Sequence, residues 1–138
     1  MKIEVRYYSK TGNSKKLANA IAEELKIEAL DVNNNLNEDV DVLFICNSIY
    51  WAGIDSKVKN FVKDNAGKIK LLVNVSTAAI KKSSYGQMKK LAKDNNINLS
   101  EKEFHCPGSF MGMHKNRPND DDIKALKAFV CEALDGDK

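Results

Sequence analysis

The sequence predicts an α/β fold in which one parallel β-sheet is covered by helices on both faces. Apolar stretches alternate with amphipathic stretches along the whole chain, which indicates strands alternating with helices. Two of the apolar stretches, Val40 to Ser48 (VDVLFICNS) and Ile69 to Ser76 (IKLLVNVS), are almost continuous, as in strands buried on both faces. A chain of 138 residues can bury one core, and no repeat, low-complexity tract or linker divides it. We therefore expect one domain over residues 1–138.

The elements of the first half follow from local patterns. The β-branched and aromatic run Lys2 to Tyr8 (KIEVRYY) indicates the first strand. Ser14 to Lys26 has apolar residues at helical spacing, with lysines and glutamates between them. A short, weak strand is expected at Ile27 to Val32, followed by a polar loop over residues 33–38. The apolar positions of the first helix are Leu17, Ala20, Ile21 and Leu25.

The second half contains three predicted helix starts. Asp55 or Ser56 is suited to cap a helix. Ser84 with Gln87 matches a capping box, and Asn119 precedes three aspartates, which favour the positive end of a helix. Between the last two helices, the polar run Leu99 to Cys106 indicates a weaker strand at an edge of the sheet. The inward faces of the three helices are predicted to carry Val58, Phe61 and Val62; Tyr85, Met88, Leu91 and Ala92; and Ile123, Leu126, Phe129, Val130 and Ala133.

Two charged residues do not fit a central strand. Glu4 and Arg6 occupy the face of the first strand opposite Ile3, Val5 and Tyr7, although a central strand should be apolar on both faces. Two explanations remain open. Either that face is only partly covered, or Arg6 pairs with an acid on a covering helix.

Composition restricts the class of protein. Hydrophobic residues make up 43% and charged residues 30%, and no apolar run approaches the roughly 20 residues that cross a bilayer. Met1-Lys2-Ile3-Glu4 lacks the layout of a signal peptide, and the three cysteines are an odd number without metal-like spacing. We therefore expect a cytoplasmic protein with reduced thiols and no membrane partner. A net charge of +3 without interleaved aromatics is weak support for nucleic-acid binding, so none is expected. His105 and His114 have no partner spacing for a metal.

The chemistry is predicted to lie at the first strand–helix turn, Tyr8-Ser9-Lys10-Thr11-Gly12-Asn13-Ser14. Ligands of open α/β sheets bind outside the carboxyl ends of the strands. Three hydroxyls, a glycine that permits a tight turn and the N–H groups of a helix start are combined in this segment. A phosphate monoester needs several donors that converge on its oxygens, and the segment supplies them. A helix cap alone would explain any one of these residues, but less readily the whole S-x-T-G-x-S segment.

The segment from Tyr7 to Ser14 resembles the FMN-phosphate loop of flavodoxins, whose pattern is S/T-x-T-G-x-T/S. Ser48 to Asp55 (SIYWAGID) resembles their second flavin loop, and Thr77-Ala78-Ala79 their third. Phe104 to Val130 resembles small flavodoxin-like proteins in which a G-x-F segment and an R/H-P-N-x-x-D segment precede the last helix. The resemblance covers nearly the full chain and is that of a short-chain flavodoxin.

This resemblance implies a flavodoxin-like, doubly wound, five-stranded parallel sheet of order 2-1-3-4-5. It also implies a cytoplasmic electron carrier that binds FMN, uses its semiquinone/hydroquinone couple and meets redox partner proteins as a monomer. Trp51 stands where the family places an aromatic against the flavin ring, and Gly53 where a peptide flips toward reduced flavin N5. Tyr85 is either a second stacking aromatic or a core residue. The implied cofactor-binding positions are Ser9, Lys10, Thr11, Gly12, Asn13 and Ser14; Ser48, Tyr50, Trp51, Ala52 and Gly53; Thr77, Ala78 and Ala79; and Tyr85.

Two features depart from the family pattern. The third loop continues into Lys81 and Lys82 in place of the acidic and aromatic residues that many flavodoxins have there, and the protein is basic overall. Near the flavin these lysines would favour its anionic reduced form; otherwise they belong to a solvated loop. The loop from Ser109 to Arg117 offers Phe110, Met111 and Met113 as a cover for the flavin edge.

Other functions on related folds were weighed. An FMN-dependent NAD(P)H:quinone-type reductase is the main alternative, and a flavin-free binding module is a further one. A receiver domain needs acids after the first strand and an aspartate after the third, where this chain has Tyr7-Tyr8 and Asn47-Ser48. A low-molecular-weight phosphatase needs a cysteine in the first loop, which has none. The last two classes are excluded.

Overall fold

The protein is built around one sheet with the strand order β2-β1-β3-β5-β6, all pairs parallel, and with β4 added antiparallel to β3. The computed structural model describes residues 1–50, 53–78, 83–108 and 116–135. The strands are β1 (Ile3–Tyr7), β2 (Ala29–Asp31), β3 (Val42–Tyr50), β4 (Gly53–Ile54), β5 (Leu72–Ala78) and β6 (Phe104–Pro107). The helices are α1 (Asn13–Leu25), α2 (Ser56–Asp64), α3 (Tyr85–Asp94) and α4 (Asp120–Asp135), with a 3-10 turn at Ala66–Lys68.

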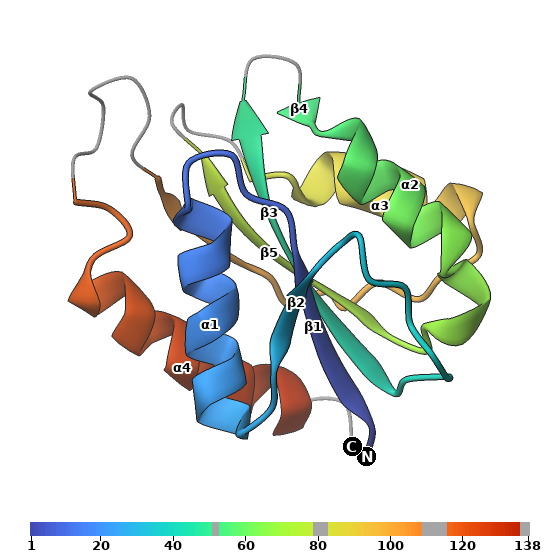
Figure 1. The fold of residues 1–138 in the computed structure, drawn as a ribbon, viewed down its shortest axis with the longest axis horizontal. Coiled ribbons are helices and arrows are strands. Elements are labelled where there is room, and N and C mark those ends of the chain that lie inside the picture. The colour runs from blue at the N-terminus through green and yellow to red at the C-terminus, as the bar shows by residue number, and fades with distance from the viewer. Residues whose placement is uncertain (51–52, 79–82, 109–115, 136–138) are drawn as a thin grey trace.

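The helices form two layers. Figure 1 shows α1 and α4 on one face of the sheet and α2 and α3 on the other. Alternate residues of the central strands face each layer, so the core is divided into two clusters. Phe44 and Val75 pack with Leu17 and Val130 on the α1/α4 side, and Leu43 packs in the cluster on the α2/α3 side. The predicted doubly wound architecture and strand order are confirmed.

The strand ends differ from the prediction. β3 continues two residues beyond Ser48 and turns back through β4, where Ile49 pairs with Ile54 and Tyr50 with Gly53. The polar strand expected from Leu99 is reduced to four residues at the edge, because the chain before Phe104 contacts β5 through a single bridge, Leu72 to Leu99.

Arg6 is buried, with 2% of its surface exposed, but neither of the two sequence-based explanations describes it. Its partner acid is Glu4 on the same strand, with 2.7 Å between Arg6 Nη1 and Glu4 Oε1. The loop after β2 covers it, and the guanidinium donates to the carbonyls of Asn34 (2.8 Å) and Asn35 (3.4 Å). The buried guanidinium of Arg6 thus holds the loop after β2 against β1, and its hydrogen bonds offset the cost of burying the charge.

The helix starts were predicted with mixed success. Asp55 caps α2 as expected, because its Oδ1 accepts the N–H of Lys57 at 2.8 Å. The capping box expected at Ser84 and Gln87 is wrong, since Ser84 makes no side-chain cap bond. Ser84 precedes α3 but accepts from the sheet, and Gln87 turns toward β4. A reciprocal box instead opens α4, between Asn119 and Asp122. In the described ranges, no helix combines the length and apolar composition of a membrane span.

Candidate functional site

Three hydroxyl groups from three separate elements meet at the carboxyl edge of the sheet. Ser14 at the start of α1 lies 2.6 Å, oxygen to oxygen, from Ser48 on β3. Ser48 lies 2.7 Å from Thr77 on β5, its direct neighbour in the strand register. All three side chains are buried, with at most 6% of each residue exposed. The doubly wound topology produces this arrangement, because it brings the ends of β3 and β5 under the N-terminus of α1.

The hydroxyl chain retains a proton to donate. Each hydroxyl has one O–H donor and can also accept. Two hydrogen bonds among Ser14, Ser48 and Thr77 use two of the three O–H hydrogens. One O–H therefore remains for a further acceptor, and this surplus suits an acceptor-only ligand such as a phosphate oxygen.

The start of α1 is also suited to an anion. The helix has no side-chain cap and no acidic residue in its first turn, and its first intrahelical bond runs from the Lys16 N–H to the Gly12 carbonyl. The N–H groups of the first turn thus have no acceptor within the helix, and they carry the positive end of its dipole. Gly12 has φ +91, and nothing lies within 4 Å of the position a Cβ would take. Ser9 Oγ accepts the Gly12 N–H at 2.8 Å, which shapes the loop before the helix.

A second polar group lies on the opposite face of the same edge. Asn47 donates to Asn74 (2.9 Å), and Asn74 donates to Ser84 Oγ (2.9 Å) at the start of α3. The N–H of Ser84 donates in turn to Ser76 Oγ at 3.4 Å. These four side chains are fully buried, and Asn47 Oδ1 has no partner within the described residues. The network fixes α3 to β3 and β5, and none of its members was predicted as a site residue; the only signal was polar residues in otherwise apolar strands.

Comparison with known proteins identifies the family. The flavodoxin domain family matches residues 5–115, a range that includes the three hydroxyls of the site and the four residues of the second polar network. The chain belongs to the flavodoxin domain family. A relative from Methanocaldococcus jannaschii, an uncharacterised protein, is 26% identical over 136 residues, covering 88% of this chain and 90% of the relative.

Solved structures of low sequence identity share the fold of this flavodoxin domain. A flavodoxin from the domain Archaea superposes with a TM-score of 0.76 at 12% identity, covering 99% of this chain and 98% of that one. Oxidised flavodoxin 1 from Bacillus cereus gives 0.72 at 13% identity, covering 98% of each chain. Rubredoxin oxygen:oxidoreductase from Desulfovibrio gigas gives 0.71 at 14% identity, and the match covers 94% of this chain but 34% of that larger one.

The predicted site residues of this flavodoxin domain fall into three groups. The structure joins Ser14, Ser48 and Thr77 and brings the first and second loops together through Lys10, whose Nζ lies 3.6 Å from Asp55 Oδ2. The Tyr85 hydroxyl donates to the Ser100 carbonyl at 2.9 Å, a partner outside the three predicted loops. Burial, then the nearby carboxylates of Glu103 and Glu101, raise the pKa of Tyr85. Of the predicted cofactor positions, Trp51, Ala52 and Ala79 lie outside the described residues, and Tyr50 is described only by its strand position. The lysines and the covering loop considered for the flavin edge also lie outside them: Lys81, Lys82, Phe110, Met111 and Met113.

Gly108 was missed by sequence reasoning, although it lies directly against two predicted residues. A Cβ at Gly108 would lie 2.8 Å from Asn13 Nδ2 and 2.9 Å from Thr77 Cβ. The end of β6 therefore approaches the start of α1 and the end of β5 so closely that only glycine fits. A glycine directly after a strand was the available signal.

The thiols offer no nucleophile at this edge. Burial raises the pKa of Cys46 far above its ordinary value. Burial and the Asp122 carboxylate raise the pKa of Cys106 to about 12. Both thiols thus stay protonated near neutral pH. Among the residues the structure describes, no group of three or more His, Cys, Asp and Glu side chains is placed to hold a metal ion.

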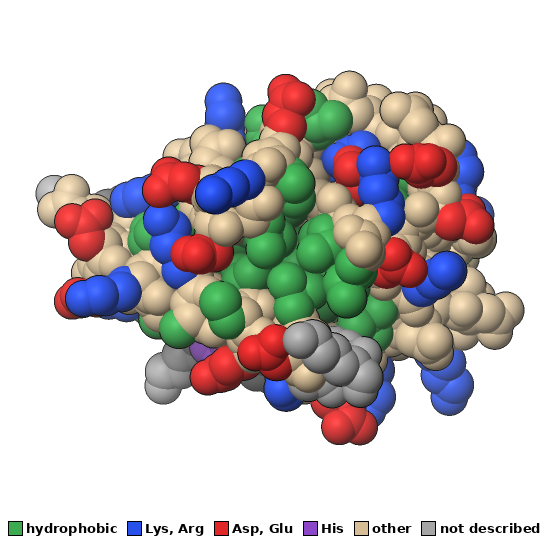
Figure 2. Space-filling view, turned by 90° about the horizontal axis from the view of Figure 1, so that it is seen from below, with side chains coloured by type: hydrophobic (Ala, Val, Ile, Leu, Met, Phe, Trp, Pro, Cys, Tyr) green, Lys and Arg blue, Asp and Glu red, His purple; other side chains and the backbone are tan. Residues whose placement is uncertain are grey.

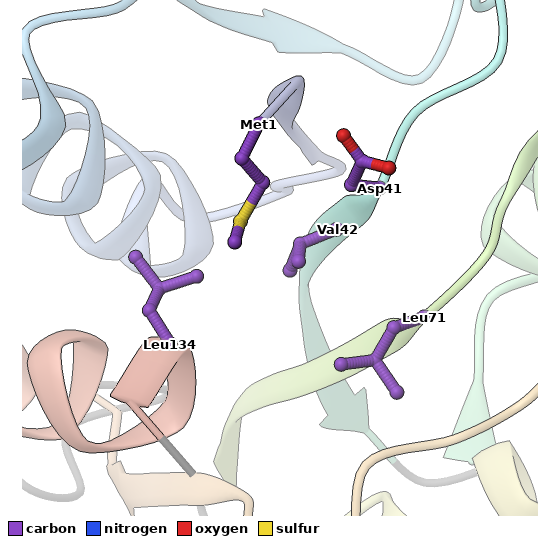
Figure 3. Close-up of a pocket in the computed structure, with 5 residues that line it drawn as sticks. All are labelled: Met1, Asp41, Val42, Leu71 and Leu134. Atoms are coloured by element: carbon purple, nitrogen blue, oxygen red, sulfur yellow. The ribbon is translucent and has the colours of Figure 1, made fainter. Parts of the chain in front are cut away.

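The amino edge of the sheet contrasts with the site. Figure 2 shows hydrophobic side chains gathered at the middle of this face, with charged side chains around them. A hollow of about 380 Å³ lies there, lined by Met1, Val42, Leu71, Leu134 and Asp41 (Figure 3). Its one carboxylate, Asp41, already accepts the Lys2 N–H (2.7 Å) and lies 3.4 Å from Lys70 Nζ. Apolar walls and a carboxylate do not suit a phosphate. The hydroxyls and the helix N-terminus that can donate to an anion lie at the carboxyl edge instead.

Proposed function

We propose that this protein binds FMN at the carboxyl edge of its sheet and transfers electrons to a partner protein. The observation that carries the proposal is the convergence of Ser14, Ser48 and Thr77 at the uncapped start of α1, with one O–H left to donate. Membership of the flavodoxin domain family and the fold shared with flavodoxins support the same assignment.

The residues present fit the phosphate of FMN. The first turn of α1 would donate backbone N–H groups to it, and the open space above Gly12 would let it approach the backbone closely. Ser9, Thr11 and Ser14 are the hydroxyl donors of the loop, and Ser48 and Thr77 orient Ser14 from below. When bound, the flavin supplies one- and two-electron chemistry that no side chain of this protein provides.

Loading with flavin tests the proposal. Purified protein mixed with FMN should show the visible bands of a bound oxidised flavin, and the emission of Trp51, the only tryptophan, should be quenched with saturation at one equivalent. Riboflavin, which lacks the phosphate, should bind much more weakly. If FMN and riboflavin bind equally weakly, the phosphate assignment fails; if neither binds, the function fails.

A carrier and a reductase differ in what reduces the flavin. For a carrier, FMN-loaded protein should not consume NADH or NADPH, even with a quinone present, whereas a one-electron chemical reductant should reduce it fully. Steady NAD(P)H consumption that depends on added quinone would replace the carrier with a reductase on the same fold.

A further inference from the structure

One side chain outside the sequence-predicted site reaches the turn that follows β3. Gln87, in the first turn of α3, accepts the N–H of Ile54 through its Oε1 at 3.0 Å. Ile54 is the last residue of β4, which pairs with the end of β3 through Ile49–Ile54 and Tyr50–Gly53. In the sequence, Trp51 and Ala52 connect the two strands. The acceptor of the Ile54 N–H thus comes from α3, 33 residues further along the chain.

The carboxamide of Gln87 also covers Gly53. A Cβ at Gly53 would lie 2.5 Å from Gln87 Oε1 and 2.6 Å from Gln87 Nε2, far inside van der Waals contact. Gly53 has φ +87, a conformation that glycine adopts without strain. Gln87 therefore makes two contacts with consecutive residues of the turn, one a hydrogen bond and one a close packing contact.

β4 has few backbone bonds of its own. β4 consists of two residues and pairs with β3 through two residue pairs only. Besides these pairs, the described residues hold β4 through the buried side chain of Ile54, which packs in the cluster on the α2/α3 side. α2 begins two residues after β4, so the chain leaves the sheet immediately.

The helix that carries Gln87 is itself firmly attached. Asn74 Nδ2 donates to Ser84 Oγ directly before α3, and the Tyr85 hydroxyl donates to the Ser100 carbonyl. Met88, the residue after Gln87, is fully buried. β5 thus holds the start of α3 through Asn74 and Ser84, and α3 in turn holds β4 through Gln87.

We propose that Gln87 is a positioning residue that holds β4, through Gly53 and Ile54, at the edge of the flavin site, an inference that rests on the proposed function. The hydrogen bond of Gln87 goes to Ile54 of β4, not to the first strand–helix loop. Its loss should weaken contacts with the flavin ring and leave the phosphate contacts unchanged.

The test compares four variants of the full chain. Gln87→Ala removes the acceptor and the packing, Gln87→Met removes the acceptor but keeps the bulk, and Gln87→Glu keeps an acceptor for the Ile54 N–H. Lys89→Ala, an exposed position on the same helix, is the control. The first readout needs no flavin: acrylamide quenching of Trp51 in the apoprotein should rise for Gln87→Ala and Gln87→Met and stay at the wild-type value for Gln87→Glu and Lys89→Ala.

The second readout separates ring from phosphate. Gln87→Ala and Gln87→Met should raise the dissociation constants of FMN and riboflavin by the same factor, roughly threefold to tenfold for one neutral hydrogen bond. The dissociation constant of inorganic phosphate should not change. Unchanged Trp51 quenching and flavin affinity in both variants would overturn the proposal, as would a parallel loss of phosphate binding. If the wild-type protein binds no FMN while the apoprotein quenching still rises, the proposed function fails and the support of the turn by Gln87 stands.

Discussion

At the residue scale, two glycines with positive φ differ in their surroundings. Gly12 (φ +91) faces open space, whereas Gly53 (φ +87) lies under the Gln87 carboxamide. Gly67 has neither a positive φ nor any atom within 4 Å of a Cβ position. Alanine would therefore meet neither backbone strain nor overlap at Gly67, backbone strain alone at Gly12, and both at Gly53.

Alanine substitutions at these glycines should destabilise the protein in a fixed order. Gly67→Ala should change the free energy of unfolding by less than about 0.5 kcal/mol. Gly12→Ala should cost about 1–2 kcal/mol through backbone strain alone. Gly53→Ala should cost about 1 kcal/mol more than Gly12→Ala, because the Gln87 carboxamide must also move and release the Ile54 N–H. Urea denaturation measures all three, and equal effects at Gly12 and Gly53 would contradict the contact with Gln87.

Ser48 is the central member of the hydroxyl chain. Ser48→Ala would leave the Ser14 and Thr77 hydroxyls buried without the partner that each now has. We expect a loss of about 1–3 kcal/mol in unfolding free energy and weaker FMN binding, because Ser14 would no longer be oriented. Ser56→Ala, at an exposed position at the start of α2, is the matched control and should stay within about 0.5 kcal/mol. Should the two variants behave alike, the chain contributes neither stability nor orientation.

At the scale of the element, the helix starts show where local sequence patterns are sufficient. Asp55 caps α2 through a neighbour two residues away, so the pattern predicted it. The pattern at Ser84 and Gln87 was equally good, but Asn74 and Ile54 compete for these two side chains from distant strands. Partners that only the tertiary fold brings near cannot be found from the local sequence.

The start of α4 contains the reciprocal box. Asp122 Oδ2 accepts the Asn119 N–H at 2.8 Å, and Asn119 Oδ1 accepts the Asp122 N–H at 3.0 Å. Arg117 holds the same carboxylate with two bonds of 2.6 and 2.8 Å. The hydrogen bond from Arg117, more than any other influence, holds the pKa of Asp122 below its ordinary value of 3.8.

This lowered pKa predicts acid sensitivity. A carboxylate whose pKa is depressed by folding contributes stability above its unfolded pKa, and that contribution is lost as the pH falls through the lower, folded value. Asp122→Asn should therefore destabilise the protein by about 1–3 kcal/mol near pH 7, and the difference from wild type should shrink below about pH 4. Asp121→Asn, exposed in the same helical turn, is the control. A wild-type advantage that is constant from neutral to acid pH would contradict the role of the ionised Asp122.

At the scale of the whole molecule, periodicity and topology predicted the layers, the strand order and the edge that bears the site. Ser14 could be chosen from the strand–helix turn in the sequence, and Ser48 and Thr77 from the resemblance to the flavin loops of flavodoxins. Their proximity follows because parallel strands end at one edge. The partners of Arg6 could not be chosen from the sequence, because the covering loop has no pattern that specifies its distance from β1. Asn47 and Asn74 likewise appeared as interruptions of apolar strands, and only the register of β3 and β5 places them together.

The anion donors at the carboxyl edge predict how ligands affect the thermal stability of the whole domain. Ser14, at the start of α1, is hydrogen-bonded to Ser48 of β3, which is bonded to Thr77 of β5. A ligand bound at the proposed site should therefore stabilise α1, β3 and β5 together. A ligand that binds only the folded state adds about 2.7 kcal/mol at a concentration 100 times its dissociation constant. For a domain of this size that corresponds to a rise of roughly 10 °C in Tm.

Thermal unfolding with FMN, riboflavin and inorganic phosphate as separate ligands tests this prediction. At equal concentration FMN should raise Tm most, because it combines the ring with the phosphate, and riboflavin and phosphate should each raise it less. Thr11→Ala, which removes a loop hydroxyl, should reduce the shifts with FMN and phosphate but not the shift with riboflavin. If riboflavin gives the same shift as FMN, or if Thr11→Ala lowers all three shifts equally, the first loop does not bind the phosphate, and the anion-binding character assigned to the carboxyl edge is wrong.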